Sequence, residues 1–106
     1  MKEVLGMDDI ENRCECCGRT GVETTVHHLT PREYGGAHLP TALLCIPCHK
    51  QIHHLYTNKQ LVDQGLTTLS ALQQDPAMQS FIRWIRKTPP GTIPRSRKSR
   101  NVRGRR

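Results

Sequence analysis

Apolar residues in this chain occur in short, separate groups, and each group in the first half predicts one small element. Val and Thr residues over about 22–28 predict a β-strand, and the sequence TALLC at 41–45 predicts a second. Pro47 fits the first turn of a helix that continues over 48–57. Between the strands, prolines and two adjacent glycines predict a loop over 29–41. The first half therefore predicts two strands followed by a helix.

The next part of the chain predicts two short helices. Asn58 is a candidate N-cap for a helix over 59–64, which Gly65 ends. Three leucines then recur every three residues and suggest a short amphipathic helix: Leu66, Leu69 and Leu72.

A last helix carries an apolar stripe. Asp75 is suited to cap it and Pro76 to occupy its first position, and the helix then continues over 77–88. Its apolar residues follow the i, i+3, i+4, i+7 pattern of one helix face, with Trp84 beside them: Met78, Phe81, Ile82 and Ile85. We interpret this stripe as core that docks the helix on the rest of the protein; an interface with a partner is the other interpretation.

The size and composition of the chain limit its core. It has 106 residues, 35% of them hydrophobic and 4% aromatic, which indicates one small domain in need of a staple such as a metal ion or disulfides. We see no signal peptide and no segment able to span a membrane. We therefore expect a cytoplasmic location, where paired cysteines are metal ligands more often than disulfides.

Four of the five cysteines form two C-x-x-C pairs. Cys14 and Cys17 make the first pair, and Cys45 and Cys48 make the second. Two such pairs supply four thiolates for a closed, tetrahedral structural zinc site that performs no chemistry. Cys16 is left over and could replace Cys17, although the C-x-C spacing lacks the usual reach.

The histidines predict a second metal site. His49 and His53 are four residues apart on the predicted helix, so both imidazoles can bind one ion. A third ligand from the adjacent pair His27 and His28 would complete a partial shell that leaves room for water and substrate. Neighbouring residues of a strand point in opposite directions, so the pair can serve two roles. The other interpretation is that His49 and His53 are ordinary surface residues without a function. His54 points away from their helix face, and we expect it to contact solvent or phosphate.

The order of these motifs resembles the HNH endonuclease family. The resemblance covers about residues 14–56 and is carried, in order, by Cys-x-x-Cys, VHHLTPREYGG, LLCIPCH and His53. This order is similar to the ββα-metal (His-Me finger) unit embedded in a four-cysteine zinc site, as in small bacterial or phage members of the family. The resemblance implies a small α+β fold: an HNH finger stapled by zinc, followed by two or three short helices and a basic disordered tail. The implied division is an N-terminal polar segment, the finger, a helical extension and the tail, at 1–13, 14–57, 58–90 and 91–106.

The resemblance also implies roles for the histidines. His27, His49 and His53 correspond to ligands of one catalytic divalent ion, which could be Mg²⁺, Mn²⁺, Ni²⁺ or Zn²⁺. His28 corresponds to the general base that takes a proton from water, a task suited to imidazole near neutral pH. The family usually has Asp-His at this pair, and colicin-type nucleases of the same superfamily have His-His. The implied reaction is hydrolysis of DNA phosphodiester bonds.

One residue departs from the family pattern. The Asn that braces the loop between the strands would fall at Pro40, whose side chain cannot form a hydrogen bond. His38 is a candidate to brace the loop instead, or it is a surface residue. The departure concerns the efficiency of the active site rather than the fold.

The net charge of +7 is concentrated at the C-terminus. Residues 95–106 hold seven of the sixteen Lys and Arg residues and no acid, so the remaining residues carry nine basic and nine acidic groups. Such a segment is typical of an arm that binds a polyanion, and a tail that only improves solubility is the other interpretation. The candidate DNA-binding residues are Arg95, Arg97, Lys98, Arg100, Arg103, Arg105 and Arg106.

These observations predict a metal-dependent HNH nuclease whose partner is DNA, expected to be double-stranded, with no membrane partner. The sequence leaves monomer and homodimer equally open. A non-catalytic, zinc-stabilised nucleic-acid-binding module is the main alternative, and Pro40 favours it. A metal sensor is a third interpretation. It would need reversible metal binding, whereas the two tight cysteine pairs indicate a permanently bound zinc.

Overall fold

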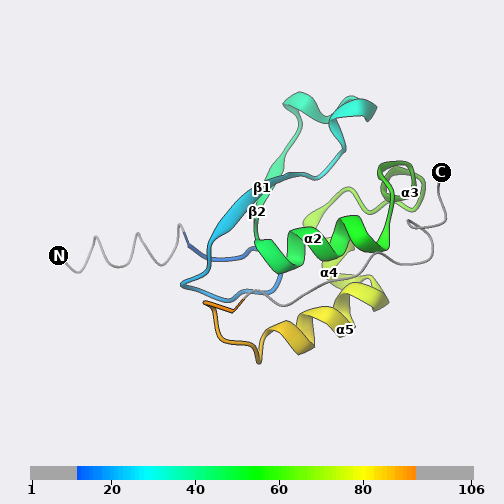
Figure 1. The fold of residues 1–106 in the computed structure, drawn as a ribbon. Coiled ribbons are helices and arrows are strands. Elements are labelled where there is room, and N and C mark those ends of the chain that lie inside the picture. Colours follow the sequence, from blue (N-terminus) through cyan, green and yellow to red (C-terminus); the bar gives the residue numbers. More distant parts are fainter. Residues whose placement is uncertain (1–11, 93–106) are drawn as a thin grey trace.

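The computed structural model describes residues 12–92. The predicted polar segment, apart from its last two residues, and all seven basic residues of the predicted DNA-binding arm lie outside the described residues. Within them, the fold is small and α+β, with a two-stranded sheet followed by helices (Figure 1).

The sheet is an antiparallel pair of strands, β1 (Thr24–His28) and β2 (Thr41–Cys45). Thr24 pairs with Cys45 at one end, and His28 pairs with Thr41 at the other, where the connecting loop begins. Both predicted strands are confirmed, although β1 starts two residues later than predicted. Val22 belongs to the loop before the strand instead, where its backbone N–H donates to the carbonyl of Asn12.

The loop between the strands contains two short 3-10 helices that the sequence did not predict. They are η1 (Arg32–Tyr34) and η2 (Gly36–His38), and Gly35 joins them with a φ of 88°. A Cβ atom at Gly36 would collide with the backbone carbonyl of Thr30, so no larger residue fits there. The adjacent glycines thus supply one left-handed residue and one close backbone approach.

Helix α2 (Ile46–Leu55) follows β2 directly and has Pro47 in its first turn, as predicted. It starts before the predicted position and ends two residues earlier, because Tyr56 is extended and closes the helix with a bond from its N–H to Ile52. The Tyr56 hydroxyl group lies 2.9 and 2.8 Å from the two carboxylate oxygens of Asp75. This contact ties the end of α2 to the start of the last helix.

Helix α3 (Asn58–Asp63) begins one residue earlier than predicted, and its cap is Thr57 rather than Asn58. The Thr57 side chain accepts from the N–H of Gln60, whose side chain accepts from the N–H of Thr57, a reciprocal capping box. The Asn58 side chain is therefore free for another task, and it donates to Glu33 in the loop.

Helix α4 (Leu69–Gln74) is capped by Thr68, so Leu66 precedes the helix although it is buried with Leu72. Helix α5 (Pro76–Ile85) has the predicted cap, with Asp75 accepting from the N–H of Met78, but ends at Ile85 instead of continuing to 88.

Three residues of the α5 stripe are buried, Phe81 is partly buried and Trp84 remains 51% exposed. The interpretation of the stripe as core is confirmed, because α5 packs against both α2 and α4 (Figure 1). The buried members of the stripe are Met78, Ile82 and Ile85. Within residues 12–92, no helix is both long and apolar enough to cross a membrane.

Candidate metal centres and active site

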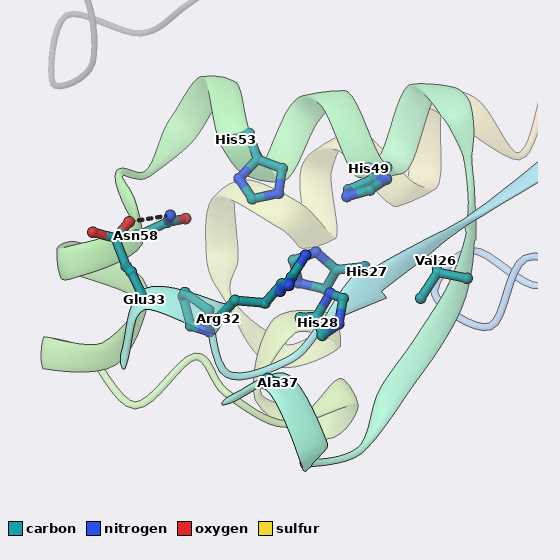
Figure 2. Close-up of a pocket in the computed structure, with 10 residues that line it drawn as sticks. Val26, His27, His28, Arg32, Glu33, Ala37, His49, His53 and Asn58 are labelled. Atoms are coloured by element: carbon teal, nitrogen blue, oxygen red, sulfur yellow. Dashed lines mark hydrogen bonds between the residues drawn. The ribbon is translucent and has the colours of Figure 1, made fainter. Parts of the chain in front are cut away.

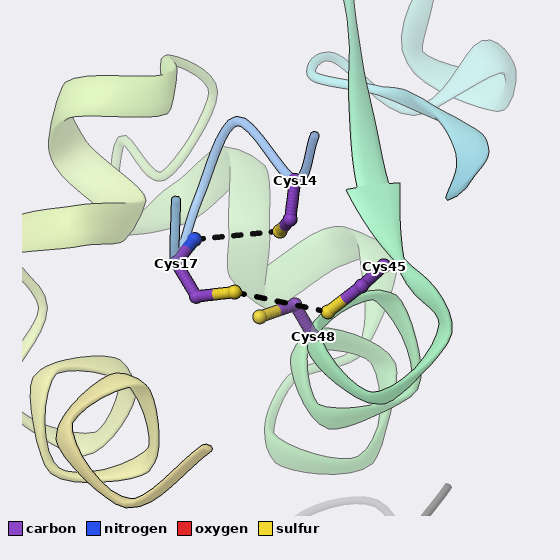
Figure 3. Close-up of side chains that lie close together, drawn as sticks. All are labelled: Cys14, Cys17, Cys45 and Cys48. Carbon is purple, nitrogen blue, oxygen red and sulfur yellow. Dashed lines mark hydrogen bonds between the residues drawn. The ribbon is translucent and has the colours of Figure 1, made fainter. Parts of the chain in front are cut away.

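The four cysteines of the two C-x-x-C pairs meet in the interior, as Figure 3 shows. Their sulfur atoms all lie within 4.8 Å of one another, and all four residues are buried. The Sγ atoms of Cys17 and Cys45 are 3.9 Å apart, and the N–H of Cys17 donates to Cys14 Sγ. The structure places Cys17 in this group, whereas Cys16 is buried but outside it.

Local structure explains how the two pairs meet. The first pair lies in a tight turn in which the N–H of Gly18 donates to the carbonyl of Cys14, and the second spans the end of β2 and the first turn of α2. Glu15 holds the turn against β2, since its N–H donates to the Leu43 carbonyl and its carboxylate accepts from the Leu43 N–H. The strand therefore brings the two pairs together.

The chemistry of this group fits a divalent metal ion. Hydrogen bonds from the thiols of Cys14 and then Cys45 and Cys48 lower the pKa of Cys17, while the surrounding thiols, first that of Cys14, raise the pKa of Cys48. Without a cation, the four buried thiols cannot all lose their protons, because their negative charges would repel one another. A divalent cation would stabilise all four as thiolates, and four sulfur ligands are typical of a closed structural zinc site.

Arg19 connects this group to the end of the described chain. Its buried guanidinium group donates from Nη2 to Cys45 Sγ over 3.4 Å and from Nη1 to the carbonyl of Thr88 over 2.9 Å. Arg86 Nε also donates to the carbonyl of Cys17. No local sequence pattern marks Arg19 as functional, because its partners are 26 and 69 residues away.

Three histidines form a second group, two of them from α2 and one from β1. His49 and His53 project from α2 toward His27 on β1 (Figure 2). The ring centroids are 5.0 Å apart for His27 and His49, 5.3 Å for His27 and His53, and 5.1 Å for His49 and His53. One nitrogen of each ring lies within 4.8 Å of the others, so the structure brings together the three predicted ligands.

The environment of these rings favours their neutral form, which can bind a cation. His27 is 2% exposed, and burial, followed by the neighbouring His49 and His53, lowers its pKa to about 4. Its Nε2 atom is buried and has no hydrogen-bond partner within residues 12–92. Burial also lowers the pKa of His49. Neutral imidazoles with a buried, unpaired nitrogen fit a divalent ion that accepts their lone pairs.

An open pocket surrounds the three histidines and has a volume of about 630 Å³. His28 lines it beside the metal-ligand candidates and is half-buried. Arg32 extends from η1 toward His27 and His28 (Figure 2). Its guanidinium group makes no hydrogen bond or ion pair with the described part of the chain, so no described residue neutralises its charge. No sequence motif pointed to Arg32.

The remaining sequence candidates lie outside this pocket. His38 is exposed at the end of η2, and its role as a loop brace stays a prediction. The backbone of Pro40 closes the loop instead, since its carbonyl accepts from the N–H of Leu29 over 3.4 Å. His54 is half-buried and lines a neighbouring depression with Lys50.

Comparison with known proteins identifies this arrangement. Residues 14–55, which contain both metal-ligand groups, match the HNH endonuclease family. A relative in Bacillus subtilis (strain 168), the uncharacterized protein YisB, is 55% identical over 86 residues, which cover 81% of this chain and 85% of YisB. The chain belongs to the HNH endonuclease family. This confirms the family that the sequence motifs predicted. No solved structure matches the chain significantly.

The lowered pKa values predict how the HNH histidine site depends on pH. A ligand with a lowered pKa competes with protons only at lower pH, so we expect the affinity for Ni²⁺ to stay constant down to pH 6.5 and to fall toward pH 4, where His27 becomes charged. Calorimetric titration with Ni²⁺ at a series of pH values, with the cysteine-bound zinc followed by mass spectrometry, measures this. Loss of half the affinity already above pH 6.5, with zinc retained, would contradict the expectation.

Proposed function

We propose that this protein is a metal-dependent HNH endonuclease that hydrolyses DNA phosphodiester bonds. The observation that carries the proposal is the convergence of three imidazoles in an open pocket with a fourth histidine, His28, beside them. Membership of the HNH family supports nuclease chemistry. The arrangement offers three candidate ligands and one candidate base for that chemistry.

Each side chain in the pocket has a task in this proposal. His27, His49 and His53 hold the divalent ion, which when bound supplies Lewis-acid stabilisation of the phosphate and of the leaving oxygen. His28 removes a proton from the attacking water, because it lines the same pocket without belonging to the ligand group. Arg32 adds a permanent positive charge that attracts and orients the anionic phosphate.

The pocket supports the use of one ion. Among its described lining residues, Glu33 is the sole carboxylate, and its Oε1 accepts a 2.6 Å hydrogen bond from Asn58. A second ion such as Mg²⁺ would usually be held by carboxylates. The Glu33 carboxylate is already engaged by Asn58. The four cysteines hold a separate structural zinc, and a reducing cytoplasm would keep their thiols available for it.

A nicking assay tests the proposal. Supercoiled plasmid is incubated with the zinc-loaded protein and Mg²⁺, Mn²⁺, Ni²⁺ or Zn²⁺ in turn, with and without chelator, and we expect cleavage that requires an added ion. Metal analysis should find one tightly held zinc and one exchangeable ion per chain. His49→Ala is the matched control, since it removes one pocket ligand and none of the cysteines. Absence of cleavage with every ion, while DNA is still bound, would contradict the proposal.

That outcome would instead favour a non-catalytic, zinc-stabilised DNA-binding module. Pro40 is the observation on its side, because it occupies the position of the loop-bracing Asn of the family. The backbone bond from Leu29 to Pro40 closes the loop without that side chain, which is why we prefer the enzyme.

The basic tail is proposed to bind DNA phosphates and to add affinity without sequence preference. Deletion of residues 95–106 removes seven positive charges. We expect weaker DNA binding at low salt and a flatter dependence on salt, because the logarithm of affinity falls by about 0.9 per phosphate contact for each tenfold rise in salt. Fluorescence anisotropy with a labelled duplex, at several salt concentrations, measures both. Equal affinity of the full-length and shortened proteins at low salt would exclude this role.

A further inference from the structure

Thr25 lies two residues before His27 on β1, so both side chains project from the same face of the strand, toward α2. The Thr25 hydroxyl oxygen is 2.6 Å from Nδ1 of His49. It is also 3.4 Å from the backbone carbonyl of Leu44, its partner across the sheet. Strand β1 therefore carries the metal-ligand candidate His27 and, through Thr25, also contacts the ring of His49.

One assignment of the protons satisfies both contacts. A carbonyl oxygen can only accept, so in this assignment the single hydroxyl proton of Thr25 is donated to Leu44. The Thr25 oxygen then accepts from His49, which requires the proton of the His49 ring to be on Nδ1. In that tautomer the lone pair is on Nε2, the ring nitrogen that remains free to bind a metal ion.

We propose that Thr25 is a positioning residue that fixes the tautomer and the ring orientation of His49 for the divalent ion. The inference rests on the proposed function of the histidine site and adds a residue to it. Histidine ligands in metal sites commonly donate their second N–H to an outer partner, which holds the ring and raises its basicity. Here a threonine hydroxyl takes that place, anchored in turn by the backbone of β2.

Three substitutions test the role of the hydroxyl group. Thr25→Val removes the hydroxyl and keeps a β-branched side chain that suits a strand. Thr25→Ser keeps the hydroxyl and removes the methyl group. Thr24→Val is the matched control, because it makes the same change at the adjacent residue, whose side chain projects from the opposite face.

Two measurements are made on zinc-loaded protein without DNA. Nitrogen-15 NMR of the imidazole rings, with no further ion added, reports the His49 tautomer, and calorimetry reports the affinity for Ni²⁺. We expect Thr25→Val to move the proton of His49 to Nε2 and to weaken Ni²⁺ binding by about 10- to 100-fold, the usual cost of losing an outer partner. Thr25→Ser and Thr24→Val should keep the wild-type tautomer and most of the affinity.

An unchanged tautomer and an unchanged Ni²⁺ affinity in Thr25→Val would overturn the inference, even if the wild-type protein cuts DNA. If the wild-type protein does not cut DNA but the expected shifts are found, the positioning role is supported and the nuclease proposal fails separately. The zinc content of each variant verifies its fold. Should Thr25→Val lose zinc, Thr25→Ala compared with Thr25→Ser gives the same contrast of hydroxyl absent and hydroxyl present.

Discussion

Replacement of Cys17 by serine is expected to abolish stoichiometric zinc binding and with it the stable fold. The four cysteine sulfurs join the first turn to β2 and α2, and the hydrophobic core around them is small. Structural zinc contributes on the order of 10–16 kcal/mol in small zinc domains. That is comparable with the entire stability of a typical domain, about 5–15 kcal/mol. Zinc content and thermal unfolding followed by circular dichroism measure the loss.

Cys16→Ser is the matched control for this experiment. It makes the same change at the neighbouring residue, which is also buried but lies outside the group of four sulfurs. We expect this variant to retain one zinc per chain and a cooperative unfolding transition. Loss of zinc in Cys16→Ser together with retention in Cys17→Ser would reverse the assignment of the fourth ligand.

The sequence predicts best those features whose geometry is fixed within one element. His49 and His53 share a helix face because they are four residues apart, and the structure has them side by side. Asp75 followed by a proline predicted the start of α5 for the same local reason. The cap of α3 was missed although its signal is local: Thr57 with Gln60 three residues later forms a capping box, whereas Asn58 lacks such a partner.

Contacts between distant segments were not predictable in this way. The bonds of Thr25 with His49 and of Arg19 with Cys45 and Thr88 join residues that are 24, 26 and 69 positions apart. Threonine in a strand and arginine after a turn are ordinary, so neither draws attention before the elements are packed. The grouping of the four cysteines and of the three histidines could therefore be predicted from the sequence, but not the side chains that support them.

His28→Ala is expected to lower the rate of DNA cleavage by about 100- to 10,000-fold, the range for loss of a general base. The metal and DNA affinities should remain, because His28 lines the pocket without belonging to the group of three ligand candidates. Single-turnover cleavage, Ni²⁺ calorimetry and DNA anisotropy on the same preparation separate the three quantities. His49→Ala provides the contrast, since it should lose the exchangeable ion as well as the activity.

Chemical rescue strengthens the test of His28 as the base. The pocket is open and has a volume of about 630 Å³, so an imidazole molecule from solution can enter the space left by the missing ring. Added imidazole should restore part of the activity of His28→Ala without changing its Ni²⁺ affinity, whereas in His49→Ala it could act only as a replacement ligand of the ion. Cleavage by His28→Ala at the wild-type rate would show that another group activates the water.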